Sequence, residues 1–393
     1  MYLSFNCHNT IRKLLALIVT GTLFCTHTYA ETTIIDTHEN TPINVTFINP
    51  TNVGDPFWDK VTSLMQQVAA DLQINLNVKH SSSNRFSYNQ QLTQALNEAH
   101  LPDYLIYIYH RNSGAEILRI AEKKGVDSII INSEIPPADL DSVGAPGRTF
   151  KHWQGLFTTN DRDGGYALAK HLHACSQELL TENTPTTNIA AISGGHDSTS
   201  AGNKNAGLKD FVAESDNTTL SQLVHTDWSP KHAQNLARMM VKRYPTLNSL
   251  WFANAEMTLA TLDFNQSFSK KSGRTLCIGG FDFVADAIKE LHSGRIDALS
   301  GGAFMDGARA LMHIRRLRDN QPTSTTFVAP SKLLTTSNVD MYARALDRDS
   351  WEAINFQDML DQFGEQPDYG LSLDSLKALS EQIPPSEAKP TLN

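Results

Sequence analysis

Residues 249–282 of the chain, SLWFANAEMTLATLDFNQSFSKKSGRTLCIGGFD, contain a predicted strand, a helix and a second strand in that order. The runs at 249–253 and 275–279 are short and mostly apolar, which is typical of strands buried on both faces. The segment 257–269 between them is predicted to be helical. Strands that alternate with helices form βαβ units, so this stretch predicts an α/β fold with parallel strands.

The same alternation runs in both directions from this stretch. Further strands are predicted at 43–49, 74–78, 104–109, 128–132, 189–193 and 220–225. Predicted helices lie at 57–72, 88–99, 114–124, 164–179, 204–213, 230–244, 284–292 and 304–318. An irregular loop around 139–154 interrupts the alternation once, and 393 residues are too many for one core. We therefore predict two similar, doubly wound parallel-sheet lobes. From residue 336 onward the periodicity is weak, and the chain ends in a Pro-rich polar tail that we expect to be frayed.

The first 30 residues have the features of a secretory signal peptide. Arg12 and Lys13 carry positive charge, 14–25 form an apolar run, and 28–30 supply small residues before a cleavage site. An uncleaved N-terminal anchor is the alternative, but the apolar run is shorter than the roughly 20 residues that span a bilayer. The expected location is the periplasm.

The charge of the chain argues against nucleic acid or an anionic membrane as its partner. Its formal net charge is −9, and loss of Arg12 and Lys13 with a segment that holds no acidic residue leaves −11. An acidic chain without a basic block binds such partners poorly. No later run approaches the length of a membrane span.

Two cysteines, Cys175 and Cys277, remain after the signal peptide. They form no CxxC motif and have no metal-ligand spacing, so no metal site is predicted. We interpret them as two buried apolar thiols. An oxidising compartment also permits a disulfide between them, although no local pattern indicates one.

Polar and aromatic side chains follow the predicted strands, where ligands bind in parallel sheets. Asp282 is a carboxylate that could accept hydrogen bonds from two ligand hydroxyls, and the amides of Asn132 and Asn254 can both donate and accept. Trp58 and Trp228 offer flat apolar faces to a sugar-like ring. The alternative for the tryptophans is core packing, and Asp55 and Asn254 could instead be turn or N-cap residues.

A periplasmic α/β hydrolase acting on a small ester or glycoside is the alternative function. The chain lacks GxSxG, HExxH and P-loop motifs, and no cofactor is predicted. His196-Asp197-Ser198 places the residue types of a catalytic triad side by side, but triads converge from separate segments. We interpret this run as a loop and a helix N-cap. Gly194-Gly195 and Gly279-Gly280 are interpreted as tight turns at strand ends, because no GxGxxG follows a strand.

At these residues the chain resembles the type I periplasmic binding proteins, in particular the ribose-binding and LuxP-like group. The resemblance extends from about residue 43 to 330 and rests on the order and spacing of six segments: DPFW (55–58), TNDRDGG (159–165), SGGHDSTSAGNKNAGL (193–208), WFANAEM (251–257), IGGFD (278–282) and GRIDA (294–298).

The resemblance implies a set of ligand contacts from both lobes. The implied residues are Asp55, Phe57, Trp58, Asn132, Thr159, Trp228, Asn254 and Asp282. Pentose binders of the family carry two arginines where this chain has Ser133 and about Gly202, which puts a ribose-like specificity in doubt and disfavours an anionic ligand.

The resemblance also implies the domain organisation and the partners. The N-terminal lobe would comprise 43–158 and 302–330, and the C-terminal lobe 159–301 and 331–365, before a tail at 366–393. Three crossings near 157–160, 300–304 and 329–333 would form the hinge. The protein would be a monomer that closes on a small polar ligand, sugar-like or autoinducer-like, and is not an enzyme. Its membrane partner would be an ABC permease or a sensor kinase or cyclase.

Overall fold

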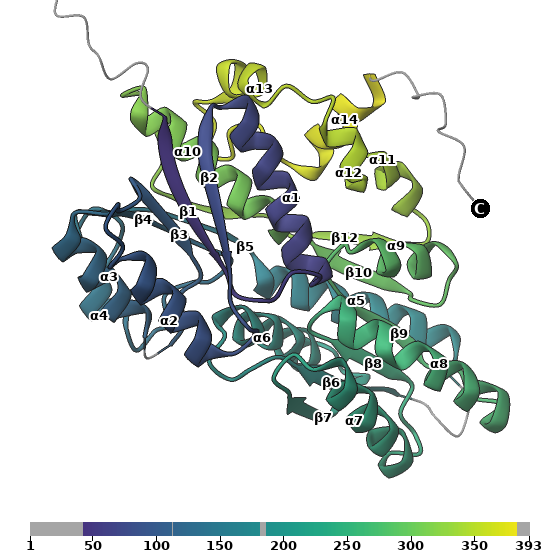
Figure 1. The fold of residues 1–393 in the computed structure, drawn as a ribbon. Coiled ribbons are helices and arrows are strands. Elements are labelled where there is room, and N and C mark those ends of the chain that lie inside the picture. Colours follow the sequence, from purple (N-terminus) through teal and green to yellow (C-terminus); the bar gives the residue numbers. More distant parts are fainter. Residues whose placement is uncertain (1–41, 112, 181–185, 383–393) are drawn as a thin grey trace, which may run out of the picture. The chain divides into compact units, whose positions relative to one another are not determined.

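The computed structural model describes residues 42–111, 113–180 and 186–382, which contain two six-stranded sheets (Figure 1). The first sheet has the order β11-β5-β4-β3-β1-β2 and the second β12-β10-β9-β8-β6-β7. All neighbouring strands are parallel except β10 and β12. The predicted pair of doubly wound lobes is confirmed. We call the part built on the first sheet the first lobe and the part built on the second sheet the second lobe.

The strands of the first sheet are β1 (Ile43–Asn49), β2 (Ile74–His80), β3 (Tyr104–Tyr107), β4 (Asp127–Ile131), β5 (Trp153–Thr159) and β11 (Thr326–Ala329). Those of the second sheet are β6 (Thr187–Ser193), β7 (Thr218–His225), β8 (Ser249–Phe252), β9 (Cys277–Phe281), β10 (Ala298–Gly301) and β12 (Lys332–Thr335).

Helices precede, connect and follow these strands. The longer helices are α1 (Pro56–Asp71), α2 (Arg85–Ala95), α3 (Gly114–Lys124), α5 (Asp161–Glu178), α6 (Thr199–Glu214), α7 (Pro230–Arg243), α8 (Ala255–Ser272), α9 (Ala285–His292), α10 (Asp306–Arg318), α13 (Phe356–Phe363) and α14 (Leu373–Gln382). The short ones are α4 (Leu140–Val143), α11 (Ala343–Leu346), α12 (Arg348–Trp351) and the 3-10 helices η2 (Ala303–Met305) and η3 (Val339–Tyr342).

Alternating side chains give each sheet two buried faces. In β1, Phe47 packs into the core with helices α1 and α10, whereas its neighbour Ile48 packs into a separate core with α2 and α3. In β9, a Cβ on Gly279 would lie 2.6 Å from the side chain of Leu168 on α5. A Cβ on Gly280 would lie 2.0 Å from Thr258 on α8. These glycines are therefore strand residues pressed between helices, and their interpretation as a tight turn is wrong.

The chain passes between the two sheets three times, which is the predicted three-strand hinge. β5 is followed by α5 of the second lobe, and β10 is followed by η2 and α10, which packs on β5. β11 of the first sheet then leads directly to β12 of the second. The three passages fall at residues 160, 302 and 330–331.

The segment after β12 is helical, despite the weak periodicity of its sequence from residue 336. The Pro-rich end that is expected to be frayed lies largely outside the described residues. Lys60 Nζ on α1 donates to Leu346 O over 2.7 Å, and Trp351 stacks on Phe304 with ring centres 5.8 Å apart. Arg309 on α10 donates to Leu371 O over 2.7 Å. Buried contacts with α1 and α10 hold the helices of this segment in place. The division of the chain into domains by residue number stays a prediction.

Two expectations about the N-terminus concern residues outside the described part. The signal peptide, 1–30, and its alternative as an anchor both fall there. Within the described ranges, no helix combines the length and the apolar character that a membrane crossing requires.

Candidate functional site

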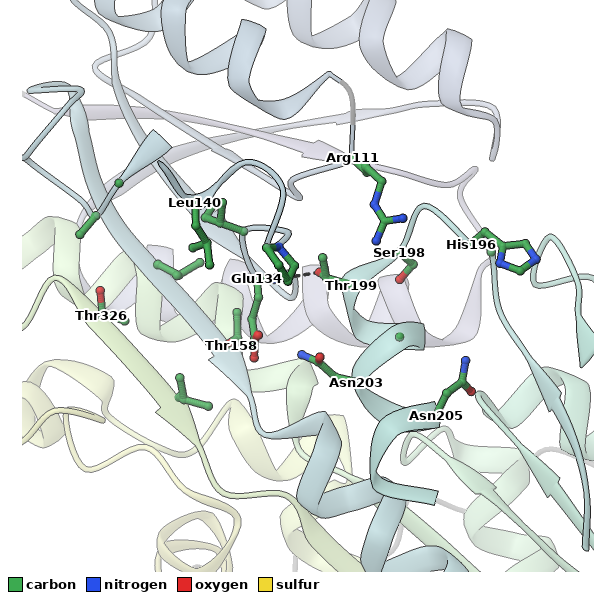
Figure 2. Close-up of a pocket in the computed structure, with 18 of the residues that line it drawn as sticks. Arg111, Glu134, Leu140, Thr158, His196, Ser198, Thr199, Asn203, Asn205 and Thr326 are labelled. Carbon is green, nitrogen blue, oxygen red and sulfur yellow. Dashed lines mark hydrogen bonds between the residues drawn. The ribbon is translucent and has the colours of Figure 1, made fainter. Parts of the chain in front are cut away.

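A cavity of about 780 Å³ lies between the lobes, beside the hinge strands (Figure 2). Its walls are the loop that follows β4, one face of β5 and β11, and the first turns of α6. Three charged side chains line it, namely Arg111 and Glu134 from the first lobe and Lys209 from the second. None of the eight residues predicted to contact a ligand lines this cavity.

Two direct contacts join the lobes at the start of α6. The backbone N–H of Glu134 donates to Thr199 Oγ1 over 3.0 Å, and the Arg85 guanidinium lies 3.5 Å from the Asp197 carboxylate. Ser198 caps α6, because its Oγ accepts from the N–H of Ala201 over 3.2 Å.

The same contacts show that His196-Asp197-Ser198 is not a catalytic triad. The His196 ring stacks on the His225 ring with centres 3.7 Å apart, Asp197 pairs with Arg85, and Ser198 is the N-cap. The interpretation of this run as a loop and an N-cap is confirmed.

Three of the predicted residues lie together at the start of α1. Asp55 is its N-cap and accepts from the Trp58 N–H over 2.9 Å, while the Phe57 and Trp58 rings meet edge to face at 5.1 Å. Burial raises the pKa of the Asp55 carboxyl despite this hydrogen bond. Asp55 is therefore a capping residue that also faces a partly desolvated region.

Three more predicted residues follow strands of the second lobe. Asn254 caps α8, because its side chain accepts from the Met257 N–H over 3.0 Å. Trp228 packs closely on Gly194, where a Cβ would lie 2.1 Å from the indole ring. Asp282 follows β9 with a positive φ of 74° and is 7% exposed. Its carboxylate accepts no hydrogen bond from any residue that the structure describes.

Asp55 interacts electrostatically with two carboxylates of the second lobe, those of Asp282 and Glu256. Burial raises the pKa of Asp282 to about 6; Lys204 opposes this rise, while Asp161 and Asp55 add to it. Burial, Asp282 and Asp55 raise the pKa of Glu256 to about 7. Glu256 Oε1 is buried and has no hydrogen-bond partner within the described ranges. Carboxylates from both lobes thus share one poorly solvated region.

Lys204 lies within this acidic region, and the sequence analysis did not select it. Its ammonium donates to Ala253 O over 3.2 Å, lies 3.8 Å from the Asp161 carboxylate and sits 4.3 Å from the centre of the Phe281 ring. One sequence feature could have identified Lys204. It lies four residues before Leu208 on α6, a helical spacing that places both side chains on the buried face.

The last two predicted residues, Asn132 and Thr159, contact the hinge network. Asn132 Nδ2 donates to Ala303 O over 2.8 Å, and Thr159 Oγ1 donates to Asp306 Oδ1 over 3.2 Å. Arg309 Nη1 pairs with the same carboxylate over 3.0 Å. Burial raises the pKa of the Asp306 carboxyl, and Arg309 opposes that rise. The structure places these two predicted residues at the crossings rather than among the coupled carboxylates.

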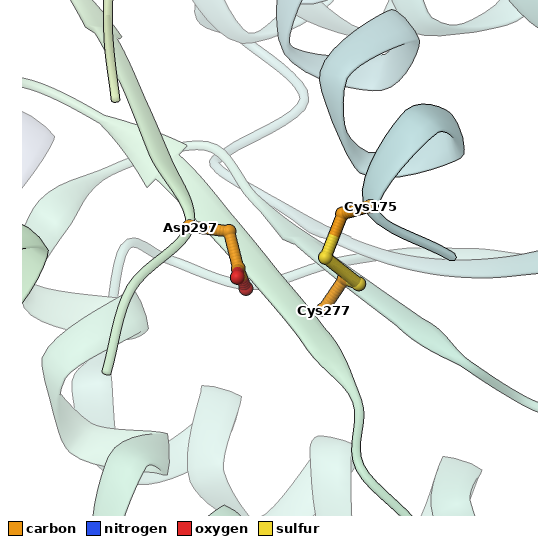
Figure 3. Close-up of side chains that lie close together, drawn as sticks. All are labelled: Cys175, Cys277 and Asp297. Carbon is orange, nitrogen blue, oxygen red and sulfur yellow. A yellow bond between two sulfur atoms is a disulfide. The ribbon is translucent and has the colours of Figure 1, made fainter. Parts of the chain in front are cut away.

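Cys175 and Cys277 form a disulfide between α5 and β9, with Cα atoms 6.2 Å apart (Figure 3). The interpretation of free thiols is therefore wrong. Asp297 lies beside the sulfur atoms and completes the one group of potential metal ligands found among the described residues. Sulfurs bonded to each other are not thiolates, so this group lacks the donor set of a metal site.

A family model described as the periplasmic binding protein domain matches residues 45–314. A periplasmic sugar-binding protein from Pseudomonas fluorescens superposes with a TM-score of 0.75 at 23% identity, covering 85% of this chain and 99% of that one. A solute-binding protein of an ABC transporter from Actinobacillus succinogenes, with bound D-allose, has a TM-score of 0.66 at 15% identity and covers 77% and 100%.

A third solved structure is similar to a comparable degree. A solute-binding protein of an ABC transporter from Bacillus halodurans, with bound myo-inositol, has a TM-score of 0.64 at 15% identity and covers 77% of this chain and 98% of that one. No curated protein sequence matches the chain.

Proposed function

Since the chain belongs to the periplasmic binding protein domain family, we propose that it binds a small polar, sugar-like solute between its lobes and presents it to a membrane partner. The family is one of binding proteins, in agreement with the expectation that the chain is not an enzyme. Its periplasmic location agrees with the proposed signal peptide at residues 1–30.

The proposal rests on the burial and the hydrogen bonding of the Asp282 carboxylate. Its carboxylate is nearly buried, follows a strand of the second sheet and accepts no hydrogen bond from the described residues. A nearly buried carboxylate without protein donors needs hydrogen bonds from water or from a ligand. Vicinal hydroxyls of a sugar would donate two hydrogen bonds to its oxygens. Glu256 Oε1 nearby has the same need for a donor.

The other proposed contacts would come from both lobes. Asp55, Phe57 and Trp58 would approach from the first lobe, and Trp228 and Asn254 from the second. Asn132 and Thr159 would act from the hinge, where their side chains already bond to Ala303 and Asp306. A solute that contacts both lobes shifts the open–closed equilibrium toward the closed state.

D-Allose and myo-inositol in two of the similar structures support a neutral polyhydroxylated ligand. The same two structures belong to ABC transporters, which favours an ABC importer as the membrane partner. A membrane sensor kinase or cyclase is the alternative, and the bound protein would act as a monomer in either case. Nanodisc pull-downs with the permease or the sensor encoded beside the gene would distinguish the two.

The test is a thermal-shift screen of the full chain, processed at its signal sequence, against sugars, polyols, nucleosides and amino acids. Ligand at one hundred times its dissociation constant adds about 2.7 kcal/mol to the apparent stability. A shift with sugars or polyols that disappears in Asp282→Ala supports the proposal. A shift confined to another chemical class, or turnover of a chromogenic ester or glycoside, would overturn it.

A further inference from the structure

Residues 336–382, which we call the brace, link the two lobes a fourth time. The chain enters the brace from β12 of the second sheet and then packs on α1 of the first lobe. Figure 1 shows the brace in yellow-green and yellow, with part of it beside α1. The family model ends at residue 314, so the brace lies beyond the region that it matches. A motion about the three crossings therefore has to accommodate a further connection between the lobes.

The attachment of the brace to the first lobe is buried. Lys60 Nζ on α1 donates to Leu346 O over 2.7 Å, and Arg309 Nη2 on α10 donates to Leu371 O over 2.7 Å. The Lys60 and Arg309 residues are 5% and 2% exposed. A buried cation that loses its acceptor costs more free energy than an exposed one. We therefore expect this part of the brace to stay with the first lobe during a hinge motion.

The attachment of the brace to the second lobe is polar and more exposed. The Asp374 carboxylate at the start of α14 accepts from Lys332 Nζ on β12 over 3.0 Å and from Tyr342 Oη on η3 over 2.6 Å. The side chains of Asp374 and Lys332 are 67% and 35% exposed. His292 on α9 lies 2.7 Å from the Asp340 carboxylate on η3, and both side chains are exposed. Exposed ion pairs stabilise weakly, so these contacts can break while each lobe stays folded.

Few residues separate the two attachments along the chain. Leu371 is bound by α10 and Asp374 by β12, three positions later, and three residues span about 10 Å at most. On the other side, η3 ends at residue 342, and α11 begins at residue 343 without a loop between them. A rotation of β12 and η3 against α10 therefore separates Asp374 from Lys332 and Tyr342.

The structure shows the lobes in contact with each other while the brace is intact. The Glu134 N–H donates to Thr199 Oγ1 over 3.0 Å, and the Arg85 guanidinium lies 3.5 Å from the Asp197 carboxylate, each pair joining one lobe to the other. The bonds of Asp374 are made in the same arrangement. They therefore favour closed lobes over an open state in which these bonds are absent.

We propose that the brace acts as a latch across the hinge, which favours the closed lobes before any ligand binds and releases at Asp374 when they open. The bonds of Asp374 then set the ratio of open to closed protein. A ligand that prefers the closed state has to supply less of the closing free energy, because part of the population is already closed. That consequence for the ligand rests on the proposed solute-binding function, whereas the latch itself does not.

The test measures the distance between the lobes of the full chain without ligand, by double electron–electron resonance. Spin labels at Phe86→Cys and Lys231→Cys occupy exposed positions at the starts of α2 and α7, one on each lobe. Asp374→Ala removes the bonds from Lys332 and Tyr342, and should raise the ratio of open to closed distances roughly 3–10-fold. Tyr342→Phe removes one of these bonds, and should raise the ratio roughly 2–5-fold.

Glu381→Ala is the matched control. It also removes an exposed carboxylate from α14, but its ion-pair partner Lys377 lies on the same helix, so no contact between the lobes is lost. Its distances should equal those of wild type. The inference is overturned if Asp374→Ala keeps the wild-type distances, if Glu381→Ala shifts them as far, or if wild type is already mostly open. No ligand is present, so this result and that of the thermal-shift screen can fail independently.

Discussion

Thr159 Oγ1 donates a hydrogen bond to Asp306 Oδ1 across 3.2 Å, and this bond joins the first crossing between the lobes to the second. Asn132 contacts the same carboxylate over 3.4 Å, and Arg309 pairs with it over 3.0 Å. The buried Asp306 carboxylate therefore connects the end of β4, two crossings and the start of α10. The relative position of the hinge segments therefore depends on the hydrogen bonds and the ion pair of the Asp306 carboxylate.

Asp306→Ala should destabilise the protein by about 3–5 kcal/mol, because it leaves the Arg309 guanidinium buried without its partner. Thr159→Val removes a single hydrogen bond to Asp306 and should cost about 1 kcal/mol. Urea unfolding followed by circular dichroism measures both. If both variants lost equally little free energy of unfolding, the contacts of Asp306 would not stabilise the hinge.

Asp282→Asn should change how stability depends on pH. The folded-state pKa of about 6 lies above the ordinary value of 3.8, so the native protein holds a proton that the unfolded chain releases between these values. This contribution to stability is present below about pH 4 and is lost as pH rises through 6. The variant should lose less stability between pH 4.5 and 7 in thermal unfolding. An unaltered pH profile would place Asp282 in a solvated environment.

Trp228→Ala should weaken the binding of a ring ligand by roughly 1–3 kcal/mol if the ligand stacks on the indole. Trp228→Phe keeps an aromatic face and should retain most of the affinity. Titration calorimetry with the sugar found in the thermal screen compares the three proteins. The same affinity in Trp228→Ala as in wild type would assign Trp228 to packing on Gly194 alone.

Cys175→Ser should reduce stability by about 2–5 kcal/mol, because the bond closes a loop with a sequence separation of 102 residues. Reducing agent should lower the Tm of wild type and leave that of the variant unchanged. A wild-type Tm indifferent to reductant would argue that the thiols are free in the folded protein.

Lys60→Met should raise stability near neutral pH. Burial lowers the pKa of Lys60 to about 7, with Arg348 adding to the effect, so the unfolded chain binds more protons than the native protein between about pH 7 and 10.5. Wild-type stability should therefore rise with pH across that window. The Met variant should lack this rise and gain roughly 1–3 kcal/mol at pH 6. A loss of stability at pH 6 would show that the bond to Leu346 O outweighs the cost of the buried charge.

Strong local patterns allowed most of the fold to be predicted. The run at 43–49 coincides with β1, and the amphipathic segment at 114–124 coincides with α3, which ends at Gly125 in a left-handed conformation. Four strands were missed. β5 mixes polar and apolar residues, as in Gln154 and Thr158, and β10, β11 and β12 have only four residues each. These four segments form strands because they pair with other strands of the sheets, and their own sequences show no clear strand pattern.

The candidate site was harder to predict because it depends on contacts between distant segments. Strand ends identify Asp282 and Asn254, since every parallel strand ends at the same edge of the sheet. The coupling of Asp55 to Glu256 crosses from one lobe to the other. The disulfide joins residues 102 positions apart. Neither relationship leaves a local trace in the sequence.

Strand β11 has a consequence for the order in which the lobes can fold. It is the outer strand of the first sheet beside β5, yet along the chain it follows β6 to β10, five of the six strands of the second sheet. A chain that emerges from its amino end can complete the five other strands of the first sheet, but the edge of β5 stays open until 326–329 arrives. An open edge pairs readily with another chain. Most of the second sheet can therefore form while the first still exposes that edge, and β12, which pairs with β10, arrives only after β11. Until β11 pairs with β5, the open edge favours association with other chains.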